Sequence, residues 1–220
     1  MGIISIEQAD RLYWLGRYTE RVYTTLKMFS KSFDSLIDGI ADSYVDFCNS
    51  IDIPNVYNDK ADFVNRYAFD NKLPDSIISN LNRAYDNAIV LRESIGSECL
   101  AYIQLAIYEM DKARSSKSPL IELQKVNDNL LAFYGIADDQ IDSENVRNII
   151  KAGKRIERID MYARLGIGKN ELTREVHRMI PRVERSGLDY DKEKLQTIRG
   201  LLETEDIDYY RIVTEVETIF

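Results

Sequence analysis

The chain has 220 residues, of which 45% are hydrophobic and 30% charged, with a formal net charge of −8 and a pI near 4.9. This composition predicts a globular protein with a full core and excludes a disordered chain. An acidic chain repels polyanions, so we expect neither nucleic acid nor a membrane surface as a partner.

The N-terminal segment and the two cysteines bear on location. Residues 1–6 lack the basic start of a signal peptide, and no stretch approaches the roughly 18 apolar residues of a membrane span. Cys48 and Cys99 lie far apart without CxxC spacing. A disulfide between them stays open, but two buried reduced thiols suit them better. We therefore expect a cytoplasmic protein.

The first half of the chain reads mostly as helix. Apolar residues recur at steps of three and four from Leu12 to Leu36, which predicts a long helix that stops at Gly39. Residues 40–73 are less regular and predict shorter helices and a loop. Pro74 suits the first turn of the next helix. That helix is interrupted at residues 94–97, by a kink or by a new helix with Ser97 as its N-cap.

The second half continues in the same way. A helix is expected from Leu120 to Tyr134, with Gly135 as its end, and another from Ile141 to Gly166. Three shorter helices are expected after it, over residues 170–185, 189–203 and 205–219. Alternation typical of strands is nowhere sustained. The sequence thus predicts an all-α fold, a multi-helix bundle with long antiparallel helices in a single domain over residues 1–220.

One six-residue pattern occurs twice, at Gly16–Arg21 and at Gly153–Arg158. Both copies read Gly, basic, two variable residues, Glu, Arg. A glycine inside a helix costs about 1 kcal/mol relative to alanine. Its presence at the same place in both copies predicts two helices in close approach with a charged site between them. The similar helices around the copies, at residues 8–37 and 142–166, suggest internal pseudo-symmetry.

The glutamates of the two copies, Glu20 and Glu157, should border the core. In each copy the glycine and the glutamate are four residues apart and share a helix face. A buried carboxylate needs a positive or hydrogen-bonding partner, and two helices that each offer Glu and Arg could satisfy one another. The pair could form a ligand or acid–base pocket, or an internal salt-bridge network that sets helix register. We prefer the second interpretation.

The helix predicted to begin at Pro74 offers further polar side chains. Arg83 and Asn87 are four residues apart and align, and Arg92 follows about a turn and a half later. These side chains could face the two glutamates or form an ordinary solvated face, and the sequence leaves both open. The complete candidate polar cluster contains Arg17, Glu20, Arg21, Arg83, Asn87, Arg92, Glu157 and Arg158.

Metal and nucleophile motifs are weak. Asp138, Asp139 and Asp142 have the DDxxD spacing that holds magnesium in helical isoprenoid synthases, but Asp142 or Ser143 also suits a helix N-cap. The single histidine, His177, excludes a ferritin-like site, which needs two Glu-x-x-His motifs. Neither a GxSxG motif nor a P-loop is present. We therefore expect no metal site and no cofactor.

Near the first copy, three aromatic residues could line the charged site or simply pack between helices, and we prefer packing: Tyr13, Trp14 and Tyr18.

Three segments together carry a resemblance to a known family. Residues 9–21, ADRLYWLGRYTER, resemble the N-terminal signature of the bacterial Alpha-E domain family, an α-helical domain with a Glu-Arg motif. Residues 87–98 resemble its middle motif, and Gly153–Arg158 resembles its second Glu-Arg copy. Ala88 and Cys99 depart from the middle motif. The resemblance implies association with circularly permuted ATP-grasp ligases and transglutaminase-like proteins, and hence with the formation or modification of peptide or amide bonds.

Three functional hypotheses follow. The leading one is a non-enzymatic helical module that partners such a ligase through the Glu-Arg cluster. The second is an enzyme in which Glu20 and Glu157 act as general acid and base, with pKa values split by burial and by Arg21 and Arg158. In that enzyme an anionic peptide-like substrate would be held by arginines at positions 17, 83 and 92. The third is a magnesium-dependent enzyme of the isoprenoid-synthase type.

Overall fold

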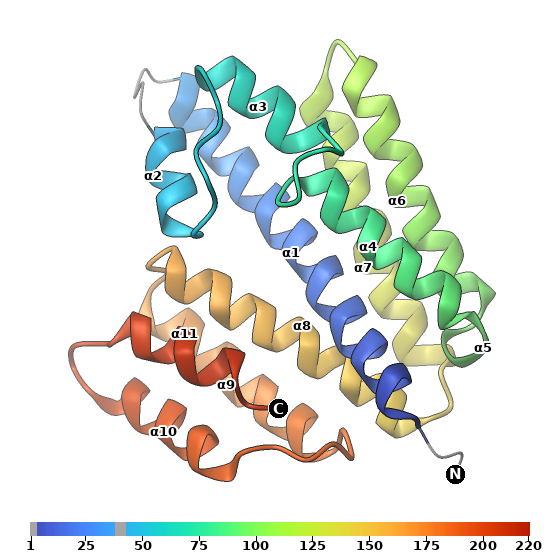
Figure 1. Ribbon diagram of the computed structural model, residues 1–220, viewed down its shortest axis with the longest axis vertical. Helices are drawn as coiled ribbons and strands as arrows, with labels where there is room; N and C mark the ends of the chain where they lie inside the picture. Colours follow the sequence, from blue (N-terminus) through green and yellow to red (C-terminus); the bar gives the residue numbers. More distant parts are fainter. Residues whose placement is uncertain (1–3, 38–42) are drawn as a thin grey trace. The chain divides into compact units, whose positions relative to one another are not determined.

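The computed structural model describes residues 4–37 and 43–220, and this part of the chain contains helices and no strand (Figure 1). The all-α prediction is therefore confirmed. In chain order the helices are α1 (Ile6–Ile37), α2 (Ser43–Ser50), α3 (Lys60–Phe69), α4 (Ile77–Val90), α5 (Arg92–Ile95), α6 (Ser97–Ser115), α7 (Pro119–Gln140), α8 (Glu144–Arg164), α9 (Lys169–Glu184), α10 (Lys192–Glu203) and α11 (Tyr209–Glu217).

The chain divides into two compact units. The first unit consists of Met1–Glu20 and Ile141–Phe220, and the second of Arg21–Gln140. Helix α1 therefore contributes its first half to the first unit and its second half to the second. The single-domain organisation stays a prediction.

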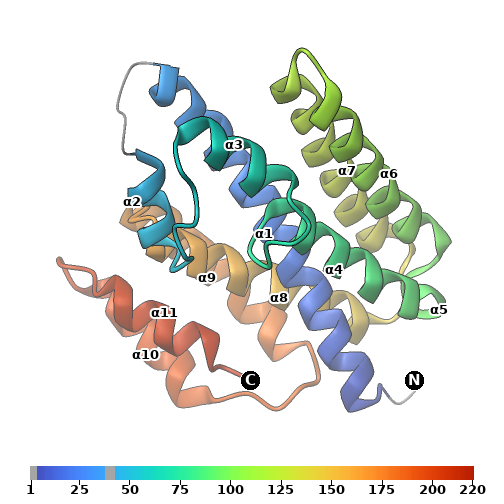
Figure 2. The ribbon, with the colours of Figure 1, turned by 45° about the horizontal axis from the view of Figure 1, so that its top comes forward.

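The first unit is built around α8, whose buried face includes Ile149, Ile156 and Ile159. Helix α9 buries an apolar stripe at Leu172, Val176, Met179 and Val183, which recurs every three or four residues as a core-facing helix requires. Helices α10 and α11 lie side by side in both ribbon views (Figures 1 and 2). Side-chain caps start three of these helices, from Ser143, Asp191 and Asp208.

The second unit is dominated by the long pair α6 and α7, which run antiparallel on either side of a short turn (Figure 2). Helix α4 packs on α6. The core of this unit includes Leu81, Ile103, Met110, Leu130 and Phe133, all essentially inaccessible to solvent. Burial of such side chains is the main source of stability for both units.

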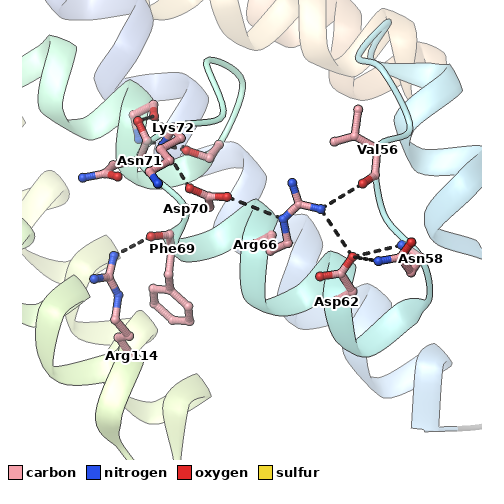
Figure 3. Close-up of polar contacts among 11 residues, drawn as sticks. Val56, Asn58, Asp62, Arg66, Phe69, Asp70, Asn71, Lys72 and Arg114 are labelled. Atoms are coloured by element: carbon pink, nitrogen blue, oxygen red, sulfur yellow. Dashed lines mark hydrogen bonds and ion pairs between the residues drawn. The ribbon is translucent and has the colours of Figure 1, made fainter.

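An aromatic cluster holds α2, α3 and the segment between them. Phe63 stacks on Tyr67, with ring centroids 5.1 Å apart, and Tyr57 meets Phe63 edge-on at 5.0 Å. Arg66 ties α3 to this segment, because its guanidinium donates to the Val56 carbonyl at 2.9 Å and lies 3.4 Å from the Asp62 carboxylate (Figure 3). The short helices predicted for residues 40–73 are thus present where the structure describes them.

Several predicted helix boundaries are wrong, and two of them show why. Helix α4 begins at Ile77 rather than at Pro74, because the Ser76 hydroxyl supplies the N-cap and accepts a bond from the Ser79 amide at 3.2 Å. Gly135 lies inside α7, which continues to Gln140. The buried residues Phe133 and Ala137 on either side continue the core face, and this packing outweighs the low helix propensity of one glycine.

The interruption after α4 takes the form of separate helices. Gly96, not Ser97, is the N-cap residue of α6, and its φ of 84° favours glycine. At α8 the capping residue is Ser143, one of the two alternatives expected. The predicted stop at Gly39 falls outside the described residues. No helix in the described segments is long and apolar enough to cross a membrane.

Candidate functional site

The repeated glycines are the points where α1 and α8 touch. A Cβ atom added to Gly16 would lie 2.1 Å from the Ile150 carbonyl oxygen, and one added to Gly153 would lie 2.2 Å from the Tyr13 carbonyl oxygen. Ile150 precedes Gly153 by three residues, and Tyr13 precedes Gly16 by three. The two copies therefore meet in a reciprocal, locally two-fold arrangement. Only glycine permits backbones this close, which accounts for both unfavourable helix residues.

The glutamates of the two copies are ion-paired across this contact. Arg17 Nε donates to Glu157 Oε2 at 2.6 Å, and Arg158 Nε donates to Glu20 Oε1 at 2.5 Å. The side chains of Glu20 and Glu157 are 0% and 1% exposed. Each buried carboxylate thus has an arginine from the other helix. The two glutamates do not lie on unrelated surfaces, so the hypothesis of internal duplication survives.

Asp160 extends the cluster by one turn of α8. Its side chain is fully buried, 3.6 Å from Arg17 Nη2 and 2.7 Å from Arg164 Nε. Burial raises the pKa of Asp160, the nearby charge of Glu157 raises it further, and Arg164 and Arg17 act in the opposite direction. Sequence reasoning missed this residue. Its position three after Glu157, on the same helix face, was the available signal.

Two aromatic residues just before the first copy pack on Arg17. Its guanidinium lies over the Trp14 ring at 5.2 Å and over the Tyr13 ring at 5.8 Å. These are cation–π distances. Tyr13 in turn meets Phe220 edge-on at 5.4 Å, and burial raises the pKa of its hydroxyl. Arg17 is therefore held by a carboxylate on one helix and by aromatic rings on its own.

A fourth buried carboxylate, Glu175 of α9, joins the network. Its side chain is 1% exposed, with Arg155 Nη1 at 2.5 Å and Arg158 Nη1 at 3.7 Å from the same oxygen, Oε2. Burial alone would raise the pKa of Glu175, but Arg155 and Arg158 lower it below its ordinary value. Because Arg158 also binds Glu20, the network runs continuously from α1 through α8 to α9. Sequence reasoning missed Glu175, whose signal was a carboxylate set within the apolar stripe of α9.

Lys154 occupies the place in the second copy that Arg17 occupies in the first. Burial lowers its pKa to about 7, although Glu20 acts to raise it, and Arg158 and Arg155 lower it further. This amine therefore titrates near neutral pH, unlike an ordinary lysine.

The other residues of the predicted polar cluster belong to the second unit. Arg83 Nη1 donates to the Pro74 carbonyl at 2.8 Å, and Arg92 Nε donates to the Ser97 hydroxyl at 2.9 Å. Arg21 acts on Tyr67, where it opposes the rise in pKa caused by burial. Asn87 is half-buried on α4. The expectation that residues 83, 87 and 92 face the two glutamates stays a prediction.

The aspartates with DDxxD spacing and the two cysteines are the remaining residues that the sequence marked for chemistry. Asp138 and Asp139 lie in the last turn of α7, and Asp142 follows the helix. Among residues 4–37 and 43–220, no group of three or more His, Cys, Asp or Glu side chains could hold a metal ion. The DDxxD spacing therefore has no geometric support. Cys48 and Cys99 are free and buried, and burial raises the pKa of each thiol to about 11.

Comparison with known proteins identifies the family. The model of the Alpha-E family, described as a predicted alpha-helical domain with a conserved ER motif, matches residues 7–204. No curated protein and no solved structure matches the chain. The matched range includes both six-residue copies and every helix from α2 to α10, so it covers most of the chain. The protein therefore belongs to the Alpha-E family.

Proposed function

We propose that this protein is a non-catalytic helical module that assists a circularly permuted ATP-grasp ligase or a transglutaminase-like protein in forming or modifying peptide or amide bonds. The Glu-Arg cluster would hold α1 against α8 in one register. The surface offered to the partner would then be fixed before binding, which lowers the entropic cost of association.

The observation that carries this proposal is that the two glutamates of the Glu-Arg cluster are shielded from solvent and paired across the two helices. Glu20 and Glu157 are almost completely buried, and each is paired with an arginine of the other helix. A buried ion pair of this kind contributes little net stability compared with apolar packing, but it disfavours other registers because any slip leaves a buried charge unpaired.

The enzyme alternative places other demands on the same residues. A general acid and base must lie within hydrogen-bonding reach of the substrate. With side chains 0% and 1% exposed, Glu20 and Glu157 would need α1 and α8 to separate before they could act. We therefore favour the accessory function over paired-carboxylate catalysis.

We also propose the bacterial cytoplasm as its location. The support is the state of the cysteines, which are both buried and free. Unlinked cysteines are the rule where thiols are kept reduced.

Calorimetric titration of the full chain with the circularly permuted ATP-grasp ligase encoded in the same genome tests the proposal, and the transglutaminase-like protein is titrated in parallel. We expect binding to at least one of them, and a change in amide-bond formation when the chain is added. Absence of binding to both would refute the accessory function. Turnover of a peptide by the chain alone, lost in a folded Glu157→Gln variant, would favour the enzyme instead.

A further inference from the structure

The side chains around Glu175 form a cluster with more positive than negative charge. Arg155 Nη1 and Arg158 Nη1 approach one oxygen of the Glu175 carboxylate, at 2.5 and 3.7 Å. Arg178 Nη1 and Arg174 Nε approach the other, at 3.0 and 3.6 Å. Four guanidinium groups from α8 and α9 thus converge on one carboxylate.

Three of these arginines share a single acidic partner. Among the described residues, Glu175 is the only carboxylate within ion-pair distance of Arg155, Arg174 and Arg178. Three positive charges against one negative charge leave an excess of two. The excess stands out in a chain whose net charge is −8. Like charges held together in this way are unfavourable unless a further anion joins them.

The cluster has a buried part, formed by Glu175 and Arg155, and an exposed part, formed by Arg174 and Arg178. Glu175 is 1% exposed and Arg155 is 21% exposed, whereas the Arg174 and Arg178 side chains are 54% and 52% exposed. The close ion pair between Glu175 and Arg155 holds the buried part in place. The two exposed arginines, one turn apart on α9, can turn their remaining N–H donors toward a ligand in solvent.

We propose that Arg155, Arg174 and Arg178 bind a phosphate group, either as the free ion or as the phosphomonoester of a small molecule. A phosphate group carries close to two negative charges at neutral pH, which matches the excess. The planar guanidinium fork donates to two oxygens at once, and this is the geometry in which arginine binds phosphate. A single carboxylate would neutralise only half of the excess. The site does not depend on the partner proposed above.

Calorimetric titration of the full chain with inorganic phosphate, and separately with AMP, tests this site at constant ionic strength set with sodium chloride. The site variant is the double substitution Arg174→Gln, Arg178→Gln, which leaves the buried Arg155–Glu175 pair in place. The control is Arg211→Gln on α11, because the Arg211 side chain is 57% exposed and its Nε lies 3.7 Å from the Glu215 carboxylate. Far-UV circular dichroism checks the fold of each variant.

We expect the wild-type chain to bind one equivalent of phosphate or AMP, the double substitution to weaken binding at least about tenfold, and the Arg211→Gln variant to change it less than about twofold. Tighter binding of AMP would identify a phosphomonoester as the ligand, and equal affinity the phosphate group alone. The site is refuted if about 10 mM phosphate produces no binding heat beyond the chloride control. An equal loss of affinity in both variants would refute it too, since that result reflects overall charge.

Discussion

The first and second units both use arginine–carboxylate pairs, but in opposite settings. In the first unit Arg17 and Glu157 are 140 residues apart, on different helices, with side chains 7% and 1% exposed. In the second unit Arg66 lies between Asp62 and Asp70 at 3.4 and 3.5 Å (Figure 3). Those three side chains are 22–33% exposed, and each pair spans four residues of one segment.

The difference shows that the surroundings of an ion pair, more than its chemistry, decide what it does. A partly exposed pair four residues apart contributes about 0.5 kcal/mol, and water can replace either partner. A buried pair between helices leaves an unsolvated charge when one partner is lost, which costs about 3–5 kcal/mol. The Arg66 pairs therefore support α3 locally, whereas the Arg17 pair constrains how α1 meets α8.

The largest expected effect comes from adding a side chain at the close contact between the backbones of α1 and α8. Gly16→Ala should lower the free energy of unfolding by at least about 3 kcal/mol, because the new Cβ would overlap the backbone of α8 and only movement of a whole helix could relieve the clash. Urea unfolding followed by the fluorescence of Trp14, the single tryptophan, measures this in the first unit.

Gly200→Ala is the matched control, since Gly200 lies inside α10 and a Cβ there meets nothing within 4 Å. It should stabilise the chain by up to about 1 kcal/mol through helix propensity. Effects of the same sign at both glycines would contradict the close approach of α1 and α8.

The next effect comes from breaking one buried pair without changing its shape. Glu157→Gln should destabilise the first unit by about 3 kcal/mol, because Arg17 keeps its charge in a site that is hardly exposed. Asp160, 3.6 Å from Arg17, offsets only part of the loss. Urea unfolding measures the change. If Glu157→Gln lowers the free energy of unfolding by less than about 1 kcal/mol, the buried pair contributes no more than a surface ion pair.

A smaller effect concerns pH in the buried cluster. The folded pKa of Lys154, about 7, lies below its ordinary value of 10.5, so the unfolded chain binds more protons between these two values. The free energy of unfolding should therefore rise with pH across that window. Above it Lys154 is neutral in both states, and the cost of burying its charge is gone. Lys154→Met should reduce the slope between pH 7 and 8.5 by about 1 kcal/mol per pH unit. Identical slopes for wild type and variant, from urea unfolding at several pH values, would exclude the buried amine as the cause.

The smallest effect is expected at the exposed pair. Asp62→Asn should cost less than about 1 kcal/mol, and the difference from wild type should shrink further at high salt, because solvent screens both Asp62 and Arg66. Thermal unfolding at low and high sodium chloride measures it. A cost equal to that of Glu157→Gln would remove the distinction between the two regions.

The sequence predicted the contact between α1 and α8 better than it predicted the composition of the cluster. A glycine repeated in two helical stripes has few explanations other than close approach, and the reciprocal Gly16–Ile150 and Gly153–Tyr13 contacts agree with it. The partners of each charge were harder to predict. The two copies were expected to satisfy one another, and Arg158 does pair with Glu20, 138 residues away, but the motif did not indicate Arg17 as a partner of Glu157.

Residues outside the repeat escaped prediction for a related reason. Glu175 and Asp160 belong to no motif, so only their spacing marked them: Asp160 follows Glu157 by three residues, and Glu175 lies within the apolar stripe of α9. Local rules failed where packing overrode them, as at Gly135, which continues α7 instead of ending it. Local rules succeeded where a side chain bonds its own backbone, as at the Ser143 cap of α8.

A double-mutant cycle on Arg17 and Glu157 tests the central claim most directly. The free energy of unfolding is measured for wild type, Arg17→Met, Glu157→Leu and the double variant, by urea unfolding with Trp14 fluorescence. We predict a coupling energy of at least about 2 kcal/mol, so that the double variant is more stable than the sum of the single losses implies. A coupling below about 0.5 kcal/mol would contradict the claim that this buried pair holds α1 to α8.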